Sequence, residues 1–300
     1  MSGYIQSLEG TEAGHQLAMI LALTAAFLHA FLGSLQKGRV DPWLSRGAID
    51  TGFVLLTLPI ALFLVPAPQG REWWLIIGTM PFMFIYKWLM ALAYSRAAYT
   101  VVYPVVRGSG PFFTVIGAWI LFGETFTVTQ WGGVALLMAG IMGLAVYNMI
   151  HIRVDRDRLV PALWLAVATG LATAGYTTWG ALAIRNTADP FTYLAWFFVL
   201  TAVDMPLIAA WRWPRTPYKP PLRDLVRLGV TGAVIGWGSF GTVMLATRLD
   251  KVGEAAVLRE TSTVFAALIG WLVLKETVGP RRVALMVLIA LGAVVVEMGG

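Results

Sequence analysis

The sequence predicts an all-α membrane protein with ten transmembrane helices, arranged as two inverted five-helix repeats around a central cavity. The first observation is composition: 58% of the 300 residues are hydrophobic and 13% are charged, against about 45–50% and about 25% in soluble domains. The second is that the apolar residues gather in segments of roughly 20, the length that crosses a bilayer. The third is an internal repeat, in which the pattern of residues 96–125 returns at 248–277.

Ten apolar segments are predicted to cross the bilayer. The first follows an acidic start with Glu9 and Glu12, which is unlike the basic start of a signal peptide, so we expect a retained helix. The fourth, 98–122, is expected to kink at Pro104 and Pro111, because proline removes a backbone donor. In order, the predicted spans are 16–35, 47–65, 73–94, 98–122, 128–147, 160–184, 190–211, 224–247, 252–274 and 279–298.

A polar segment, residues 148–158, divides the chain into two repeats. The first repeat is residues 1–147 and the second is residues 159–300, with five predicted spans in each. Because five is odd, the second repeat must insert upside down relative to the first. The two repeats are therefore expected to be related by a pseudo-two-fold axis in the membrane plane.

Loop charge predicts the orientation. Most Lys and Arg residues lie in the connections that follow the odd-numbered spans, and the other connections hold only Arg71, Arg185, Arg248 and Lys251. The positive-inside rule places the basic connections in the cytoplasm and both termini outside it. We expect an integral protein of a bacterial inner (plasma) membrane, present as a monomer or a homodimer.

Several function classes are disfavoured by composition. The chain has no cysteine, so it has no disulfide framework, and its three histidines are too scattered for a metal cluster. The net charge of +6 lies mostly in short loops, which argues against a nucleic-acid partner. A membrane-embedded enzyme is disfavoured because Asp204 is the only deep aspartate that the spans suggest and no HExxH motif occurs. We expect no cofactor and no bound metal.

Two arginines are predicted near the middle of the membrane. Arg107 lies in the fourth span, and the repeat places Arg259 at the matching position of the ninth. A guanidinium at that depth is costly and usually marks a site or a pathway. Inverted symmetry would bring the two side chains together beside a central cavity, where their planar forks could bind carboxylate or phosphate.

Four further ionisable residues are predicted at depth: Lys87, Asp204, Glu260 and His29. One interpretation is that these charges and the arginines form buried ion pairs that hold the two halves together. The other is that the arginines bind an anionic group of a substrate, while Glu260, Asp204 or His29 carries a proton or contacts a cationic group. Arg107, Arg259 and Lys87 are three cations at this depth, and Asp204 and Glu260 are two carboxylates. The one unmatched positive charge favours an anionic or zwitterionic ligand.

The repeated motifs resemble those of the drug/metabolite transporter superfamily, in its EamA-type ten-helix members. The resemblance lies in Pro104 and Pro111, followed by WILFGET at 119–125, and in the second copy WLVLKET at 271–277. Trp179-Gly180 is similar to a Trp-Gly pair in the first helix of a half, whereas the first half has His29-Ala30 there. We expect Glu124 and Glu276, within these motifs, to make structural contacts at helix ends.

The resemblance implies a basket-like transporter that works by alternating access without an ATPase domain. Triose-phosphate translocators of the superfamily hold phosphate with basic residues of the fourth and ninth helices, the helices of Arg107 and Arg259 here. Members of the family are usually drawn with both termini in the cytoplasm, and the loop charges of this chain argue for the opposite orientation.

The predicted function is secondary transport, with export as the expected direction, of a small anionic or zwitterionic metabolite such as an organic acid, an amino-acid-like compound or a phosphorylated compound. The alternative is proton-coupled efflux of amphipathic or cationic compounds stacked on deep tryptophans, including Trp88, with Glu260 or Asp204 as the acid. A non-transporting assembly subunit is a further alternative. The predicted substrate-binding residues are Arg107, Arg259, Lys87, Tyr103, Tyr176, Trp179, Trp237 and Glu260.

Overall fold

The computed structural model describes residues 2–35, 41–96, 99–151, 156–217, 219–272 and 279–300, and within these ranges every regular element is a helix. The helices are α1 (Ser2–Leu8), α2 (Glu12–Leu35), α3 (Pro42–Phe63), α4 (Arg71–Tyr94), α5 (Tyr99–Phe122), α6 (Val128–His151), α7 (Arg156–Arg185), α8 (Pro190–Thr201), α9 (Asp204–Arg212), the 3-10 turn η1 (Trp213–Arg215), α10 (Leu222–Leu249), α11 (Val252–Arg259), α12 (Ser262–Leu272) and α13 (Pro280–Met298).

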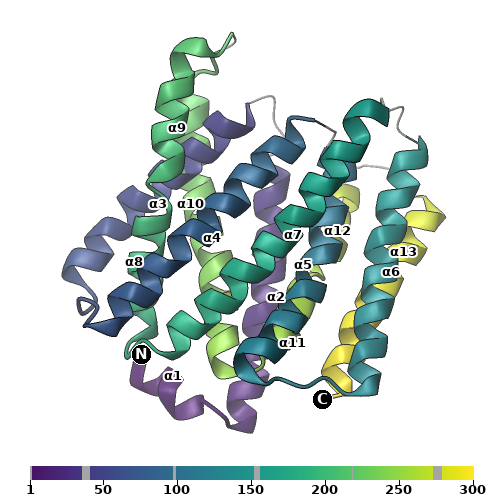
Figure 1. Ribbon diagram of the computed structural model, residues 1–300, viewed down its shortest axis with the longest axis horizontal. Coiled ribbons are helices and arrows are strands. Elements are labelled where there is room, and N and C mark those ends of the chain that lie inside the picture. The colour runs from purple at the N-terminus through teal and green to yellow at the C-terminus, as the bar shows by residue number, and fades with distance from the viewer. Residues whose placement is uncertain (1, 36–40, 97–98, 152–155, 218, 273–278) are drawn as a thin grey trace.

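The long helices lie side by side, and their connections gather at two opposite ends of the molecule (Figure 1). Both chain termini and α1 are at one end, which we call the terminus end. The connection that carries Arg215 and Lys219 is at the other end, which we call the basic end. This separation agrees with the alternation of basic and less basic connections along the sequence.

Eight segments of the described chain are long and apolar enough to cross a membrane, and a shorter apolar helix covers residues 283–298. The eight segments match the first eight predicted spans to within a few residues at each end. The prediction of a membrane protein built from helices is therefore confirmed. Close approach of helices depends on small residues, as where a Cβ on Gly133 of α6 would lie 2.7 Å from the Gly292 carbonyl oxygen of α13.

Two predicted spans are broken. The ninth, predicted over 252–274, consists of α11 and α12, separated at Glu260 and Thr261. The cause is local: the hydroxyl of Thr261 donates to the Leu258 carbonyl at 2.7 Å and that of Thr263 to the Glu260 carbonyl at 2.9 Å, in competition with the helical ladder. The seventh, predicted over 190–211, consists of α8 and α9.

The fourth span behaves differently from the ninth. Its helix α5 continues without a break through Pro104 and Pro111, the two predicted kink sites. The matching stretch of the second half contains no proline, yet it is the one that breaks. The polar run Glu260-Thr261-Ser262-Thr263 therefore interrupts its helix where two prolines do not.

Candidate functional site

A cavity lies among α2, α3, α4, α5, α7, α8, α10 and the break between α11 and α12, and it has two adjoining parts. Each part has a volume of about 80 Å³, and both are lined by His29, Arg46, Tyr86, Tyr176 and Arg259. Ligand pockets usually hold roughly 300–1,000 Å³. The helices would therefore have to move apart before a metabolite could fill this space.

The first part of the cavity is polar. It extends past Arg107 and Glu260 to Tyr103 and Tyr94. Tyr94 is the last residue of α4 and Tyr103 lies in the second turn of α5. Both of these helix ends face the basic end of the molecule (Figure 1). The polar part thus runs from the middle of the bundle toward the basic end.

The second part of the cavity is aromatic. In addition to the shared residues, Phe53, Phe197, Phe198 and Phe240 line it. The rings of Phe197 and Phe240 are stacked, with centroids 4.4 Å apart and planes 7° from parallel. A ligand in the cavity would therefore meet guanidinium groups on one side and a wall of fixed rings on the other.

Arg107 holds the broken ninth span. Its Nη2 donates to the Arg259 carbonyl oxygen at 3.2 Å and to the Ser262 hydroxyl at 2.8 Å, and its Nε lies 2.8 Å from Glu260 Oε2. The Arg259 carbonyl ends α11, where a cation is favourable. The Arg107 side chain is only 6% exposed. Arg107 is therefore bound to the backbone and to the carboxylate of the break, as well as lining the cavity.

Arg259 is held much more loosely. Its Nη2 donates to the Tyr176 hydroxyl at 3.2 Å, and its buried Nε has no hydrogen-bond partner in the described structure. The residue is 7% exposed and lines both parts of the cavity. Among the described carboxylates, none forms an ion pair with it. Arg259 is thus a buried cation that faces open volume and, in the part of the chain that the structure describes, is not neutralised by an ion pair.

The structure brings together most of the predicted site. Arg107, Arg259, Glu260, Tyr103, Tyr176 and His29 all line the polar part of the cavity. The two arginines meet there although 152 positions separate them in the sequence. With Arg46, which pairs with Asp50 at 2.8 Å, the cavity presents three guanidinium groups and one carboxylate of its own.

Lys87 and Asp204 lie elsewhere, in a cluster of ion pairs at the break between α8 and α9. Lys87 donates to Asp50 at 2.9 Å, to Asp204 and to the Thr201 carbonyl that ends α8. The side chains of Lys87 and Asp50 are 1% and 0% exposed. Lys87 does not line either part of the cavity. Its place in the substrate-binding set is therefore not supported by its surroundings, and the ion-pair interpretation describes it better.

The predicted tryptophans are packed against helices. The indole N–H of Trp179 donates to the Leu75 carbonyl at 2.9 Å, and its ring lies 5.8 Å from that of Phe82. Trp237 lies 6.1 Å from Phe198, and Trp88 lies edge-on to a ring of α3 at 5.3 Å. None of the three lines the cavity. The aromatic wall is instead built from phenylalanine and tyrosine.

Asp50, Arg46 and Tyr86 are not among the residues that the sequence predicts for the site. Asp50 is fully buried and joins Arg46 to Lys87. Burying a single carboxylate within an apolar span costs free energy, so the position of Asp50 in the sequence indicates a buried partner or a functional role. Arg46 was counted as a loop charge, but it lies within α3 and lines both parts of the cavity.

Ion pairs and hydrogen bonds close the terminus end. Glu124 pairs with Arg185 at 3.3 Å and accepts from the first backbone N–H groups of α11, those of Val252 and Gly253, at 2.9 and 3.1 Å. This agrees with the helix-end role predicted for Glu124, whereas Glu276 lies outside the described residues. Nearby, Arg248 pairs with Glu9 at 2.6 Å.

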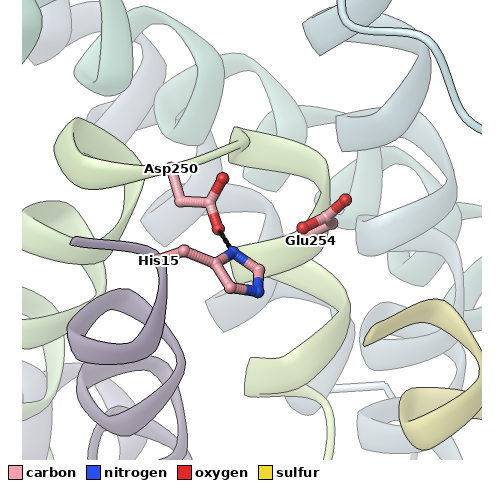
Figure 2. Close-up of side chains that lie close together, drawn as sticks. All are labelled: His15, Asp250 and Glu254. Atoms are coloured by element: carbon pink, nitrogen blue, oxygen red, sulfur yellow. Dashed lines mark hydrogen bonds and ion pairs between the residues drawn. The ribbon is translucent and has the colours of Figure 1, made fainter. Parts of the chain in front are cut away.

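His15, Asp250 and Glu254 form a second group at the terminus end (Figure 2). His15 bonds to Asp250, and the ligand atoms of the three residues all lie within 4.8 Å of one another, a spacing that a metal ion could bridge. Glu254 already accepts from Lys251 at 2.8 Å and from Gln130 at 2.6 Å. We interpret the group as ion pairs that join α2 to the junction of α10 and α11.

Comparison with known proteins gives three findings. The model of the EamA-like transporter family matches residues 16–146 and 160–298. The uncharacterized protein y4nH of Sinorhizobium fredii (strain NBRC 101917 / NGR234) is 32% identical over 128 residues, which are 42% of this chain and 93% of that protein. A solved crystal structure superposes with a TM-score of 0.73 at 19% identity and covers 93% of this chain and 95% of its own, a likeness of fold.

Proposed function

Because this chain belongs to the EamA-like transporter family, we propose that it is a secondary transporter that moves a small organic anion or zwitterion across the membrane by alternating access. The proposal rests above all on Arg259, a buried cation that faces open volume and forms no ion pair with any carboxylate of the described residues. In a weakly screened cavity, a guanidinium binds a carboxylate or phosphate in two-point contact.

The proposed architecture has ten crossings in two inverted repeats of five. In this arrangement α8 with α9 forms one broken crossing and α11 with α12 another. Three observations support it: the family model matches on either side of residues 148–158, both termini lie at one end, and Arg107 and Arg259 meet in one cavity (Figure 1). The repeats are then residues 1–147 and 159–300, as the sequence predicts.

The substrate that fits this cavity carries an anionic group and an apolar part. The anionic group binds Arg259 and the hydroxyl of Tyr176, while the apolar part lies against Phe197 and Phe240. A cationic group on the same molecule could take the place of Arg107 beside Glu260. Cationic drugs are a poorer fit, because the cavity holds more guanidinium groups than carboxylates and the predicted tryptophans lie outside it.

The state described is closed at the terminus end. Pairs such as Arg185–Glu124 and Arg248–Glu9 join neighbouring segments there, whereas the polar part of the cavity extends toward the basic end. With the basic connections in the cytoplasm, the cavity would next open inward, which suits an exporter that loads from the cytoplasm. Glu260 and His29 line the cavity and remain candidates for proton coupling, while Asp204 is bound to Lys87.

The experiment is a thermal-shift comparison on the purified protein. A bound organic acid is expected to raise the apparent melting temperature, because it binds only the folded state, and the matching amide of that acid is not. Arg259→Gln should abolish the shift, and Arg96→Gln, an exposed arginine at the end of α4, should retain it. Should Arg259→Gln bind acids as well as the unaltered protein does, the anion site is elsewhere and the proposal fails.

A further inference from the structure

A groove on the outer surface lies apart from the central cavity, at the basic end of α3, α9 and α10. Its volume is about 320 Å³. Helix α3 packs against both α9 and α10 and forms the floor between them. The walls include Leu55, Leu222, Val226 and Val230, which are 71%, 71%, 56% and 59% exposed. All four lie within candidate membrane spans, so lipid is the solvent that meets this groove.

The groove is apolar along its length and continuous with a basic segment. From Leu222 to Val230 it follows α10 for about 12 Å at 1.5 Å per residue. That length accommodates a large part of an acyl chain. The lining is almost entirely apolar, and Gly52 and Gly229 bring the backbones of α3 and α10 close together at its floor.

Residues 212–227 supply a strong positive charge beside the groove. They include five basic residues, Arg212, Arg215, Lys219, Arg223 and Arg227, and one acidic residue, Asp224. Arg223 and Arg227 are exposed and lie one turn apart, each next to a residue of the groove wall. Lys219 Nζ is 5.8 Å from the ring centre of Trp213, which also lines the groove. In the described structure, no carboxylate pairs with Lys219, Arg223 or Arg227.

We propose that this groove binds an anionic phospholipid, with an acyl chain against α3, α9 and α10 and the phosphate against Lys219, Arg223 and Arg227. Charge complementarity selects this occupant. Basic clusters beside membrane helices attract anionic head groups. A second copy of the chain is disfavoured, because a two-fold contact through this groove would bring two basic segments together. A zwitterionic lipid fits the apolar groove but leaves the cations unmatched.

Thermal stability of the purified, delipidated protein in neutral detergent tests the site. Phosphatidylglycerol is expected to raise the melting temperature by about 2–4 °C more than phosphatidylcholine with the same acyl chains does. The variant Arg223→Gln/Arg227→Gln should lose this difference. Arg281→Gln, which removes an exposed cation from another helix at the basic end, should keep it. An equal response to the two lipids, or a double variant that still prefers phosphatidylglycerol, overturns the proposal.

A second measurement does not depend on stability. Phosphatidylglycerol with brominated acyl chains quenches tryptophan fluorescence on contact, and Trp213 lines the groove. The unaltered protein should be quenched more strongly by the brominated anionic lipid than by its phosphatidylcholine counterpart, and Trp213→Phe should remove that excess. Filling the groove with Ala210→Phe should reduce it as well. Excess quenching that survives both changes places the lipid at another surface. Neither measurement depends on transport, so its result is separate from that of the anion test.

Discussion

The two broken spans are each held by a buried cation, and they differ in the charges that surround it. At each break a buried cation from a neighbouring unbroken helix donates to the carbonyl that ends the first half: Lys87 of α4 to Thr201, and Arg107 of α5 to Arg259. Each cation also pairs with a carboxylate at the break: Lys87 pairs with Asp204, the first residue of α9, and Arg107 pairs with Glu260, within the break. The same solution thus satisfies the free helix end in both places.

The difference lies in charge balance. At the break between α8 and α9, Lys87 and Arg46 meet Asp50 and Asp204, so two cations face two carboxylates. At the break between α11 and α12, Arg107 and Arg259 face only Glu260, and the surplus points into a cavity. A balanced cluster holds helices together. An unbalanced cluster has one charge left for a ligand.

Removing the cation of the balanced cluster should have the largest effect. We expect Lys87→Met to lower the free energy of unfolding by about 3–5 kcal/mol, because it leaves the fully buried Asp50 and the partly buried Asp204 with only Arg46 to compensate them. The measurement is the yield and melting temperature of the monodisperse protein in detergent. Lys87→Met/Asp204→Asn, which removes one charge of each sign, should recover part of the loss.

This variant also tests the comparison itself. A Lys87→Met protein that folds normally but no longer binds organic acids would make the break between α8 and α9 a ligand site. The two breaks would then be alike in function as well as in construction, and the distinction drawn from charge balance would be wrong.

Removing the carboxylate of the unbalanced cluster should change affinity more than stability. Glu260→Gln frees the guanidinium of Arg107 from its 2.8 Å ion pair, so that two cations can contact the ligand. A hydrogen bond to a charged group contributes about 1.5–3 kcal/mol. We therefore expect organic acids to bind about tenfold more tightly, as measured by titration of the purified variant. Weaker binding together with a loss of stability like that of Lys87→Met would mean that Glu260 only holds the break.

How far the sequence could predict these sites depends on the kind of contact. The meeting of Arg107 and Arg259 was predicted from the sequence repeat, because the proposed inversion would bring these equivalent positions together. The break at Glu260 does not follow from it, since the prolines that signal a distorted helix are in α5, which is continuous. Asp50 was overlooked because its partners come from α3 itself and from α4, and which helices become neighbours is decided by packing.

The tryptophans show the same limit of prediction from sequence, because residues expected to line the cavity lie outside it. A deep indole ring can line a cavity or fill the space between helices, and its position in the sequence is the same in both cases. Trp179 fills space, because its N–H is bonded to a carbonyl of α4 and its ring lies beside Phe82. The residues that form the aromatic wall, Phe197 and Phe240, have no ionisable group to mark them in the sequence.

The smallest expected effect comes from a residue outside both breaks. Trp179→Phe keeps most of the ring volume and removes the 2.9 Å hydrogen bond to the Leu75 carbonyl, so we expect a loss of about 1 kcal/mol in stability. Binding of organic acids should not change, because this ring does not line the cavity.

Uptake of a lipophilic cation into proteoliposomes is the informative measurement. If the unaltered protein transports such a cation and Trp179→Phe stops it while acid binding persists, the ring acts in a second open state. The cargo would then be recognised by its positive charge, and the surplus of arginine at the break between α11 and α12 would not be the feature that selects it.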